Sequence, residues 1–150
     1  MRPVAPSIFA VNDLAPPAWA NALVSAGAAV KDQQDGAERT IRPTPAATLV
    51  SVRIKRAVDL IAADFERKTI DAYGLIRAAL STLSAGEPVR FWNQLPAIHH
   101  PMDAGRDRYM VFNAGRHRAF CDWFGSGDEL AGRVATASGV GHRGGDLVIH

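Results

Sequence analysis

The order of apolar and polar positions is regular enough after residue 47 to predict secondary structure. Thr48–Lys55 alternates between apolar and polar residues and is rich in β-branched side chains, which predicts a strand. Apolar residues then recur at steps of three or four, which predicts a helix of about 20 residues with one buried face. Asp59 or Asp64 can cap this helix, which ends at Ser84-Ala85-Gly86. Its buried face comprises Phe65, Thr69, Tyr73, Ile76, Leu80 and Leu83.

The second half of the chain repeats this alternation of strand and helix. Branched and aromatic residues predict a strand over 89–98 that Pro96 ends, and a loop over 99–107 leads to a second helix with Asp107 as its N-cap. A polar turn follows Gly125-Ser126-Gly127, and two strands, Val134–Ser138 and Leu147–Ile149, flank the glycine-rich residues 139–145. This order predicts an α/β (α+β) fold, in which a mixed sheet carries two main helices on one face.

The first 46 residues are less regular, because six prolines interrupt them. Residues 31–38 are polar and predict a turn or loop. Short strands are predicted near Ser7–Val11 and Ala22–Val30. We therefore divide the chain into an irregular segment with short strands, 1–46, and an α/β domain, 47–150.

Composition narrows the possible classes of protein. With 150 residues and 47% hydrophobic residues, the chain has the size and apolar content of one folded domain. The net charge of +2 is too small to indicate a polyanion as partner. The single cysteine, Cys121, excludes an internal disulfide framework and is interpreted as a packing residue without a histidine partner. Prolines interrupt the first residues and no apolar stretch is long enough for a membrane helix, so we expect a cytoplasmic protein without a membrane partner.

The stretch 106–124 forms an unusual helical face. Tyr109, Phe112, Phe120 and Trp123 line this face, and Asn113 and Arg116 lie among them. A guanidinium held in partly dry surroundings needs an anionic partner. That partner is either a carboxylate of the protein or the carboxylate of a ligand, and the sequence leaves both interpretations open.

Other motifs carry weaker indications. Gly139, Gly141 and Gly144 spell the dinucleotide pattern G-x-G-x-x-G, but a strand follows where that motif needs a helix. The alternatives are a glycine hairpin and a backbone that a small ligand can approach closely. His142 beside these glycines is either part of a binding wall or a solvated turn residue. No pattern of histidines and carboxylates indicates a metal, and acidic residues dilute the arginines of 106–118 too much for nucleic-acid binding.

Four segments together resemble the chorismatase family: VRFWNQLPAI (89–98), DRYMVFNAGRHRAF (107–120), ASGVGH (137–142) and DLVIH (146–150). The resemblance extends from Leu49 to His150 and is most specific from Val89 to Arg118. It is closest to the 3-hydroxybenzoate-forming branch, the chorismate lyase/3-hydroxybenzoate synthases. Members of that branch have been labelled pteridine-dependent dioxygenase-like, a label that implies no pteridine cofactor.

The resemblance implies a lyase that cleaves chorismate to a hydroxybenzoate or a dihydroxylated diene with loss of pyruvate. A carboxylic acid would protonate the enol-ether methylene, pyruvate would leave, and the ring would become aromatic. In the 3-hydroxybenzoate branch, internal attack by the ring hydroxyl shifts the oxygen. No metal and no organic cofactor is implied. Because chorismate is a dicarboxylate, we expect six residues to bind it: Tyr109, Asn113, Arg116, Gly139, Gly141 and His142.

The family's architecture consists of two domains, each similar to the trimeric reactive-intermediate deaminase fold, which is itself chorismate-mutase-like. This chain has about half the length implied by the resemblance and is similar to the N-terminal half. The proton-donating acid is expected in the other half, so we expect no catalytic residue here and no turnover by these 150 residues alone. The chain ends in the apolar strand Leu147–Ile149, which we expect to be an exposed edge that needs the missing C-terminal half or an oligomer partner.

Two further functions stay open on the sequence alone. One is a non-catalytic domain that binds small carboxylates or is purely structural, and the other is a stand-alone imine deaminase of the same fold. The choice between 3-hydroxybenzoate and 4-hydroxybenzoate as product is also open, because the discriminating residues are expected downstream.

Overall fold

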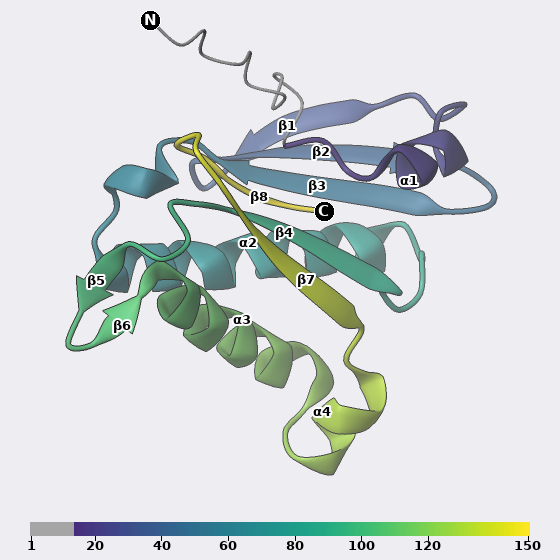
Figure 1. Cartoon of the computed structure of the whole chain (residues 1–150). Coiled ribbons are helices and arrows are strands. Elements are labelled where there is room, and N and C mark those ends of the chain that lie inside the picture. The colour runs from purple at the N-terminus through teal and green to yellow at the C-terminus, as the bar shows by residue number, and fades with distance from the viewer. Residues whose placement is uncertain (1–13) are drawn as a thin grey trace, which may run out of the picture.

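The computed structural model describes residues 14–150. It consists mainly of a six-stranded mixed sheet with two long helices on one face (Figure 1). The strands are β1 (Val30–Gln34), β2 (Ala37–Pro43), β3 (Thr48–Ile54), β4 (Arg90–Pro96), β7 (Thr136–His142) and β8 (Leu147–Ile149). They lie in the order β1-β2-β3-β8-β4-β7. The helices α2 (Ala62–Thr82) and α3 (Arg108–Phe124) pack against each other below the sheet in Figure 1. The predicted fold class is confirmed.

The first three strands form an antiparallel meander that the sequence pattern did not predict in full. β1 and β2 pair from Val30–Ile41 to Gln34–Ala37, and Asp35-Gly36 joins them with φ angles of 52° and 78°. A two-residue turn with both φ angles positive matches the twist of a hairpin. The predicted loop over 31–38 is therefore wrong, because β1 is an exposed edge strand whose residues have no need to alternate. The sheet continues across the division drawn at residue 46.

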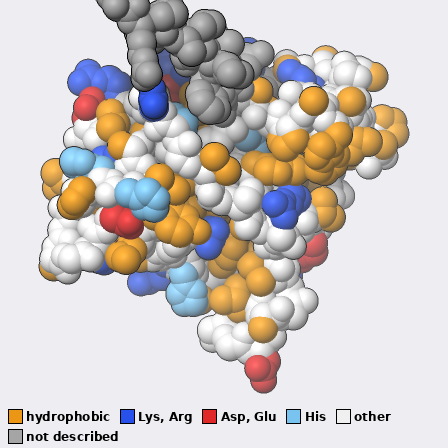
Figure 2. Space-filling view, in the orientation of Figure 1, with side chains coloured by type: hydrophobic (Ala, Val, Ile, Leu, Met, Phe, Trp, Pro, Cys, Tyr) orange, Lys and Arg blue, Asp and Glu red, His pale blue; other side chains and the backbone are white. Residues whose placement is uncertain are grey.

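A short helix stands where part of a strand was predicted. α1 (Ala18–Leu23) follows Pro16-Pro17, and its alanine-rich sequence favours a helix over the strand predicted for Ala22–Val30. Trp19 packs edge-on against Trp92 of β4, with ring centroids 5.4 Å apart. Figure 2 shows hydrophobic side chains gathered over α1, where Trp19 is 60% exposed. The strand predicted at Ser7–Val11 lies outside the described residues.

The long helix α2 confirms the periodic pattern with one exception. Five of the six positions of its predicted buried face are buried. The sixth, Leu83, is 40% exposed because the helix ends at Thr82 and Leu83 is its C-cap. Neither predicted N-cap holds: the position belongs to Ile61, while Asp64 lies in the first turn. Asp59 ends the short 3₁₀ helix η1 (Ala57–Asp59).

The strand β7 extends into the glycine-rich residues that were expected to separate two strands. It pairs in parallel with β4 along its whole length, including the pairs Asn93–Gly139 and Leu95–Gly141. A side chain on Gly139 would collide with the ring of Tyr109, and one on Gly141 would collide with Ile98. These glycines therefore belong to a strand that two side chains approach closely. The strand that was predicted to end at Ser138 continues to His142.

The predicted strand Leu147–Ile149 is confirmed as β8, but its predicted exposure is wrong. β8 lies between β3 and β4 and pairs antiparallel with both. Its three residues are buried, with Leu147 and Ile149 at 0% exposure. Residues 52–54 of β3 and 93–94 of β4 pair with it and cover both of its edges.

Three short elements lie in segments predicted as loop or turn. The hairpin of β5 (Pro101–Asp103) and β6 (Arg106–Asp107) precedes α3, and α4 (Asp128–Arg133) follows it. The N-cap prediction for Asp107 is confirmed, because its side chain accepts a hydrogen bond of 2.9 Å from the N–H of Met110. Within residues 14–150, no helix has the length and apolar character that crossing a membrane requires.

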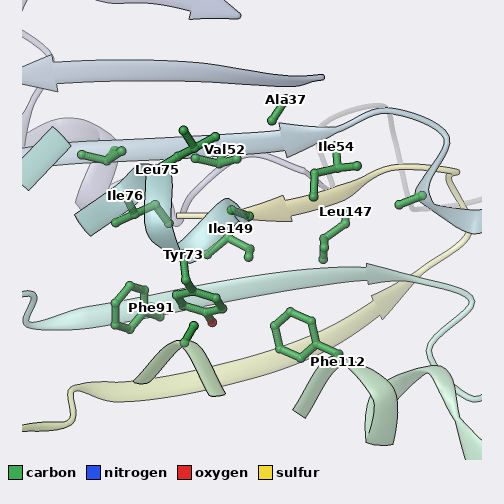
Figure 3. Close-up of a cluster of buried hydrophobic side chains, with 14 of the residues drawn as sticks. Ala37, Val52, Ile54, Tyr73, Leu75, Ile76, Phe91, Phe112, Leu147 and Ile149 are labelled. Atoms are coloured by element: carbon green, nitrogen blue, oxygen red, sulfur yellow. The ribbon is translucent and has the colours of Figure 1, made fainter. Parts of the chain in front are cut away.

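Aromatic rings fill the space between α2, α3 and the sheet. Tyr73 lies between Phe91 and Phe112 (Figure 3), with ring centroids 5.3 and 6.3 Å away. Phe120 packs on Tyr73 at 5.1 Å and on Phe124 at 5.6 Å. The helix α3 therefore has its aromatic stripe fixed against β4, and this packing sets which of its polar residues lie beside the sheet.

Candidate anion-binding site on α3

The close approach of α3 to α2 fixes the orientation of the candidate site. At Gly115, an added side chain would come within 2.7 Å of the carbonyl oxygen of Glu66 and 3.0 Å of Thr69. Only glycine permits this approach. Val111, Phe112 and Ala119 are buried beside it. Tyr109, Asn113 and Arg116 are half-buried on this helix.

Arg116 lies among aromatic rings, as the sequence predicted. Its guanidinium carbon is 5.7 Å from the centroid of Phe112 and 6.0 Å from that of Phe120. Among residues 14–150, no carboxylate lies within ion-pair distance of it. The internal carboxylate that would have explained this arginine is therefore not found in the described part of the chain. Its positive charge and its planar set of donors stay available for an anion.

Asn113 and Tyr109 flank this arginine on the helix. The Asn113 Oδ1 atom is buried and has no hydrogen-bond partner within the described residues. A buried acceptor without a donor is unusual and marks a position where a donor of a ligand would be favourable. The ring of Tyr109 lies against Gly139, and its backbone N–H donates to the carbonyl of Ile98 at 3.0 Å. The structure thus brings Tyr109 and Gly139 into contact, while Asn113 and Arg116 lie on the same helix as Tyr109.

Gly141 and His142 lie apart from this group, at the carboxyl end of β7. They border an open groove of 660 Å³ that His99, His100 and Arg143 also line. Figure 2 shows several histidine side chains on the left of the visible face. The Gly144 N–H donates to Nδ1 of His142 at 3.0 Å, so the proton on Nε2 is directed to the Asp146 carbonyl at 2.9 Å. Both ring nitrogens are engaged by the turn, so a role of His142 toward substrate stays a prediction.

Two buried polar residues, Tyr73 and Asn93, were not among the predicted site residues. Tyr73 and Asn93 are each 1% exposed, and the Tyr73 hydroxyl donates to Asn93 Oδ1 at 2.7 Å. Burial raises the pKa of Tyr73 well above its usual range, and the positive charge of Arg116 opposes this rise. The signal in the sequence was Asn93 itself, a polar residue between Phe91 and Leu95 at the alternate positions of a buried strand.

The remaining candidate chemistry on α3 is limited. Cys121 is half-buried, and its Sγ lies 3.6 Å from Nε2 of His117, so the expectation that it has no histidine partner is wrong. The spacing of four residues places both on one side of the helix. Within residues 14–150, no cluster of three or more metal-ligating side chains occurs.

A mixed sheet with two helices on one face places the chain in the α+β class. The family model described as "Chorismatase FkbO/Hyg5-like, N-terminal" matches residues 23–150. The chain therefore belongs to the FkbO/Hyg5-like chorismatase family, and it corresponds to the family's N-terminal model. The resemblance inferred from the sequence is confirmed.

A crystal structure of a chorismatase at 1.08 Å resolution is similar to this chain, with a TM-score of 0.56 and 23% sequence identity. The match covers 79% of this chain and 33% of that chain, so the 150 residues span a third of the chorismatase that they resemble. At this identity the likeness shows a shared fold. No protein with a curated description matches the sequence.

Proposed function

We propose that this chain is the N-terminal part of a chorismatase that converts chorismate to 3-hydroxybenzoate and pyruvate, with 4-hydroxybenzoate as a possible further product. Membership of the family supports a lyase acting on chorismate. In the proposed reaction, a carboxylic acid protonates the enol-ether methylene and pyruvate leaves. The ring hydroxyl attacks internally, and loss of a ring proton gives the aromatic product. The proposal includes no metal and no organic cofactor.

The observation that carries the proposal is the guanidinium of Arg116. It lies between two aromatic rings with no carboxylate of the described chain to neutralise it. Chorismate has two carboxylates, and one of them would form a pair of parallel hydrogen bonds with such a fork. The unpartnered Asn113 Oδ1 would accept a hydrogen bond from the ring hydroxyl of the substrate. We assign Tyr109, Asn113 and Arg116 to substrate binding, with Gly139, Gly141 and His142 as the neighbouring wall.

The catalytic acid is proposed to lie outside these 150 residues. A general acid that works near neutral pH needs a raised pKa, and three carboxylates of this chain have the opposite shift. The side chain of Arg106 lowers the pKa of Asp103, and the N–H of Met110 lowers that of Asp107. Burial alone would raise the pKa of Asp146, but hydrogen bonds from the Arg56 N–H and the Arg53 side chain lower it. Glu87 pairs with Arg133 at 2.6 Å.

A second chain segment would therefore complete the enzyme. The chain spans 33% of the similar chorismatase, which supports a C-terminal part or an oligomer partner as the source of the acid. We expect residues 1–150 expressed alone to bind chorismate without releasing pyruvate. Pyruvate release by this segment at a rate comparable to the longer protein would place the acid within these residues.

The decisive experiment mixes the longer protein with chorismate, follows pyruvate and identifies the aromatic product. Pyruvate together with 3-hydroxybenzoate supports the proposal, and a folded protein that releases no pyruvate refutes it. Arg116→Lys keeps the charge but loses the planar fork, so we expect KM to rise about tenfold. Arg118→Lys is the matched control, because Arg118 lies on the same helix with a side chain that is 73% exposed, and its kinetics should not change.

A carboxylate-binding domain without turnover is the second candidate function. The engagement of Asp103, Asp107, Asp146 and Glu87 with cations or backbone favours it over the imine deaminase. Calorimetry with chorismate, combined with a pyruvate assay, separates the binding domain from the lyase. A binding domain gives a heat of binding but no pyruvate, even when the longer protein is used.

A further inference from the structure

A buried chain of hydrogen bonds runs from the edge strand β7 toward α3. Asn93 Nδ2 donates to the carbonyl of Ser138 at 2.9 Å, and Asn93 Oδ1 accepts from the Tyr73 hydroxyl at 2.7 Å. A carbonyl oxygen can only accept, so the Asn93 amide has one possible orientation. The single hydroxyl proton of Tyr73 is therefore directed to Asn93, and the lone pairs of its oxygen remain as acceptors.

Arg116 is a cation that has the same aromatic neighbours as Tyr73. The rings of Phe112 and Phe120 contact both Tyr73, at 6.3 and 5.1 Å, and the guanidinium of Arg116, at 5.7 and 6.0 Å. The positive charge of Arg116 opposes the rise that burial gives the pKa of Tyr73. Tyr73 and Arg116 thus share two aromatic neighbours, Phe112 and Phe120.

We propose that Tyr73 and Asn93 are positioning residues, which hold the Arg116 guanidinium in the orientation that receives a carboxylate. This inference rests on the proposed role of Arg116 in binding substrate. An arginine side chain loses rotamer freedom when a ligand immobilises it, so ordering it in advance favours binding. A carboxylate in the place of Tyr73 would also order it, but would neutralise its charge. A hydroxyl whose proton is committed elsewhere orders the cation and leaves the charge for the ligand.

The test begins with Tyr73→Phe, which keeps the ring and removes the acceptor. We expect chorismate binding, measured by NMR titration, to weaken about three- to tenfold. In an Arg116→Met background, the same substitution should weaken the residual binding by less than about twofold, because Tyr73 acts only through Arg116. Equal effects in both backgrounds, or no effect in the first, would overturn the inference.

A readout without ligand separates this inference from the proposed function. The side-chain Nε–H of Arg116 should have a high order parameter in the wild type and a clearly lower one in Tyr73→Phe, while exposed Arg118 should not change. Loss of order in the variant supports the positioning role even where chorismate does not bind, and unchanged order refutes it. Phe91→Leu is the packing control, because Phe91 contacts Tyr73 at 5.3 Å without joining the hydrogen bonds. It should lower the stability and leave the Arg116 order parameter unchanged.

Discussion

Arg108 and Arg116 lie about two turns apart on α3, and their surroundings differ. Arg108 is 1% exposed, and its guanidinium donates to the carbonyls of Pro96 at 2.9 Å, Val58 at 3.0 Å and Ala97 at 3.3 Å. Its guanidinium carbon is also 5.6 Å from the ring centroid of Phe65. Arg116 is half-buried between aromatic rings and no carboxylate of the described chain pairs with it.

The difference shows that burial alone does not indicate a ligand site. Arg108 is removed from water, and burial lowers its pKa, whereas Arg116 is half-buried. Backbone carbonyls use the donors of Arg108 to join β4, η1 and α3, so this arginine is part of the fold. Arg108 has no carboxylate partner within the described residues either, and its buried Nε has no acceptor. What distinguishes Arg116 is that none of its donors has an acceptor among residues 14–150, although its guanidinium lies among aromatic rings. A search for anion sites should therefore follow unused donors and not burial.

Among the substitutions that test the difference between Arg108 and Arg116, we expect Arg108→Met to have the largest effect on stability. The substitution removes the Arg108 donors from the carbonyls of Pro96 and Val58, and from that of Ala97, which still accepts from the His100 N–H. The free energy of unfolding should therefore fall by roughly 3–5 kcal/mol. Denaturant unfolding followed by circular dichroism measures the change. Arg108→Lys should recover only part of it, because an ammonium group cannot reach all three oxygens. A loss below about 1 kcal/mol would show that the carbonyls find other partners, and the assignment of Arg108 to the fold would fail.

Arg116→Met should give the opposite outcome. Its side chain is held by aromatic contacts and not by carbonyls, so the free energy of unfolding should stay within about 1 kcal/mol of the wild type. Chorismate binding should weaken at least tenfold in the same variant, equivalent to about 1.4 kcal/mol. Parallel denaturation and calorimetry give both values. A variant that unfolds as readily as Arg108→Met would make Arg116 a second structural arginine.

The sequence predicted the fold best where one face of an element is buried. The periodic face of α2 and the strands β3, β4 and β8 follow from the alternation of apolar residues, because burial imposes that pattern. The sequence did not predict the edge strand β1 and predicted only the first part of the edge strand β7. β1 is exposed along its whole length and needs no apolar face, and the glycines of β7 reflect the approach of Tyr109 and Ile98 from elsewhere in the chain.

The sequence predicted only those relations within the candidate site that lie on the single helix α3. The position of Arg116 among Phe112 and Phe120 follows from the helical period, since all three lie within two turns. Its relation to Tyr73 and Asn93 depends on how α2 and β4 pack against α3, which no local pattern encodes. The burial of Arg108 was open to prediction, because it lies four residues before Phe112 and seven before Gly115 on the same stripe.

A smaller effect is expected at the N-cap that precedes Arg108. Asp107→Ala removes the acceptor of the Met110 N–H, so the free energy of unfolding should fall by less than in Arg108→Met, by the size of one helix cap. Chorismate affinity should not change, because Arg116 lies more than two turns from this helix end. Denaturation and calorimetry of the same preparation measure both. A loss of affinity in Asp107→Ala would mean that the two ends of α3 are coupled.

The smallest effect comes from the charge of Asp107 alone. Asn caps a helix as well as Asp, so Asp107→Asn removes the charge and retains the cap. The hydrogen bond from the Met110 N–H lowers the pKa of Asp107 below its ordinary value of 3.8. The folded state therefore holds the proton less readily than the unfolded chain, and the contribution of the charge is fully present above pH 3.8.

As the pH falls through the lowered pKa, this contribution is lost. The difference in the free energy of unfolding between the wild type and Asp107→Asn should thus be present at about pH 5 and should shrink toward zero below 3.8. Urea unfolding of both proteins at a series of pH values measures it. Taking the difference removes the contributions of the other carboxylates with lowered pKa values, Glu38, Asp103 and Asp146, because both proteins contain them. A difference that grows as the pH falls would mean that Asp107 is destabilising when charged, and the capping interaction would not explain where α3 begins.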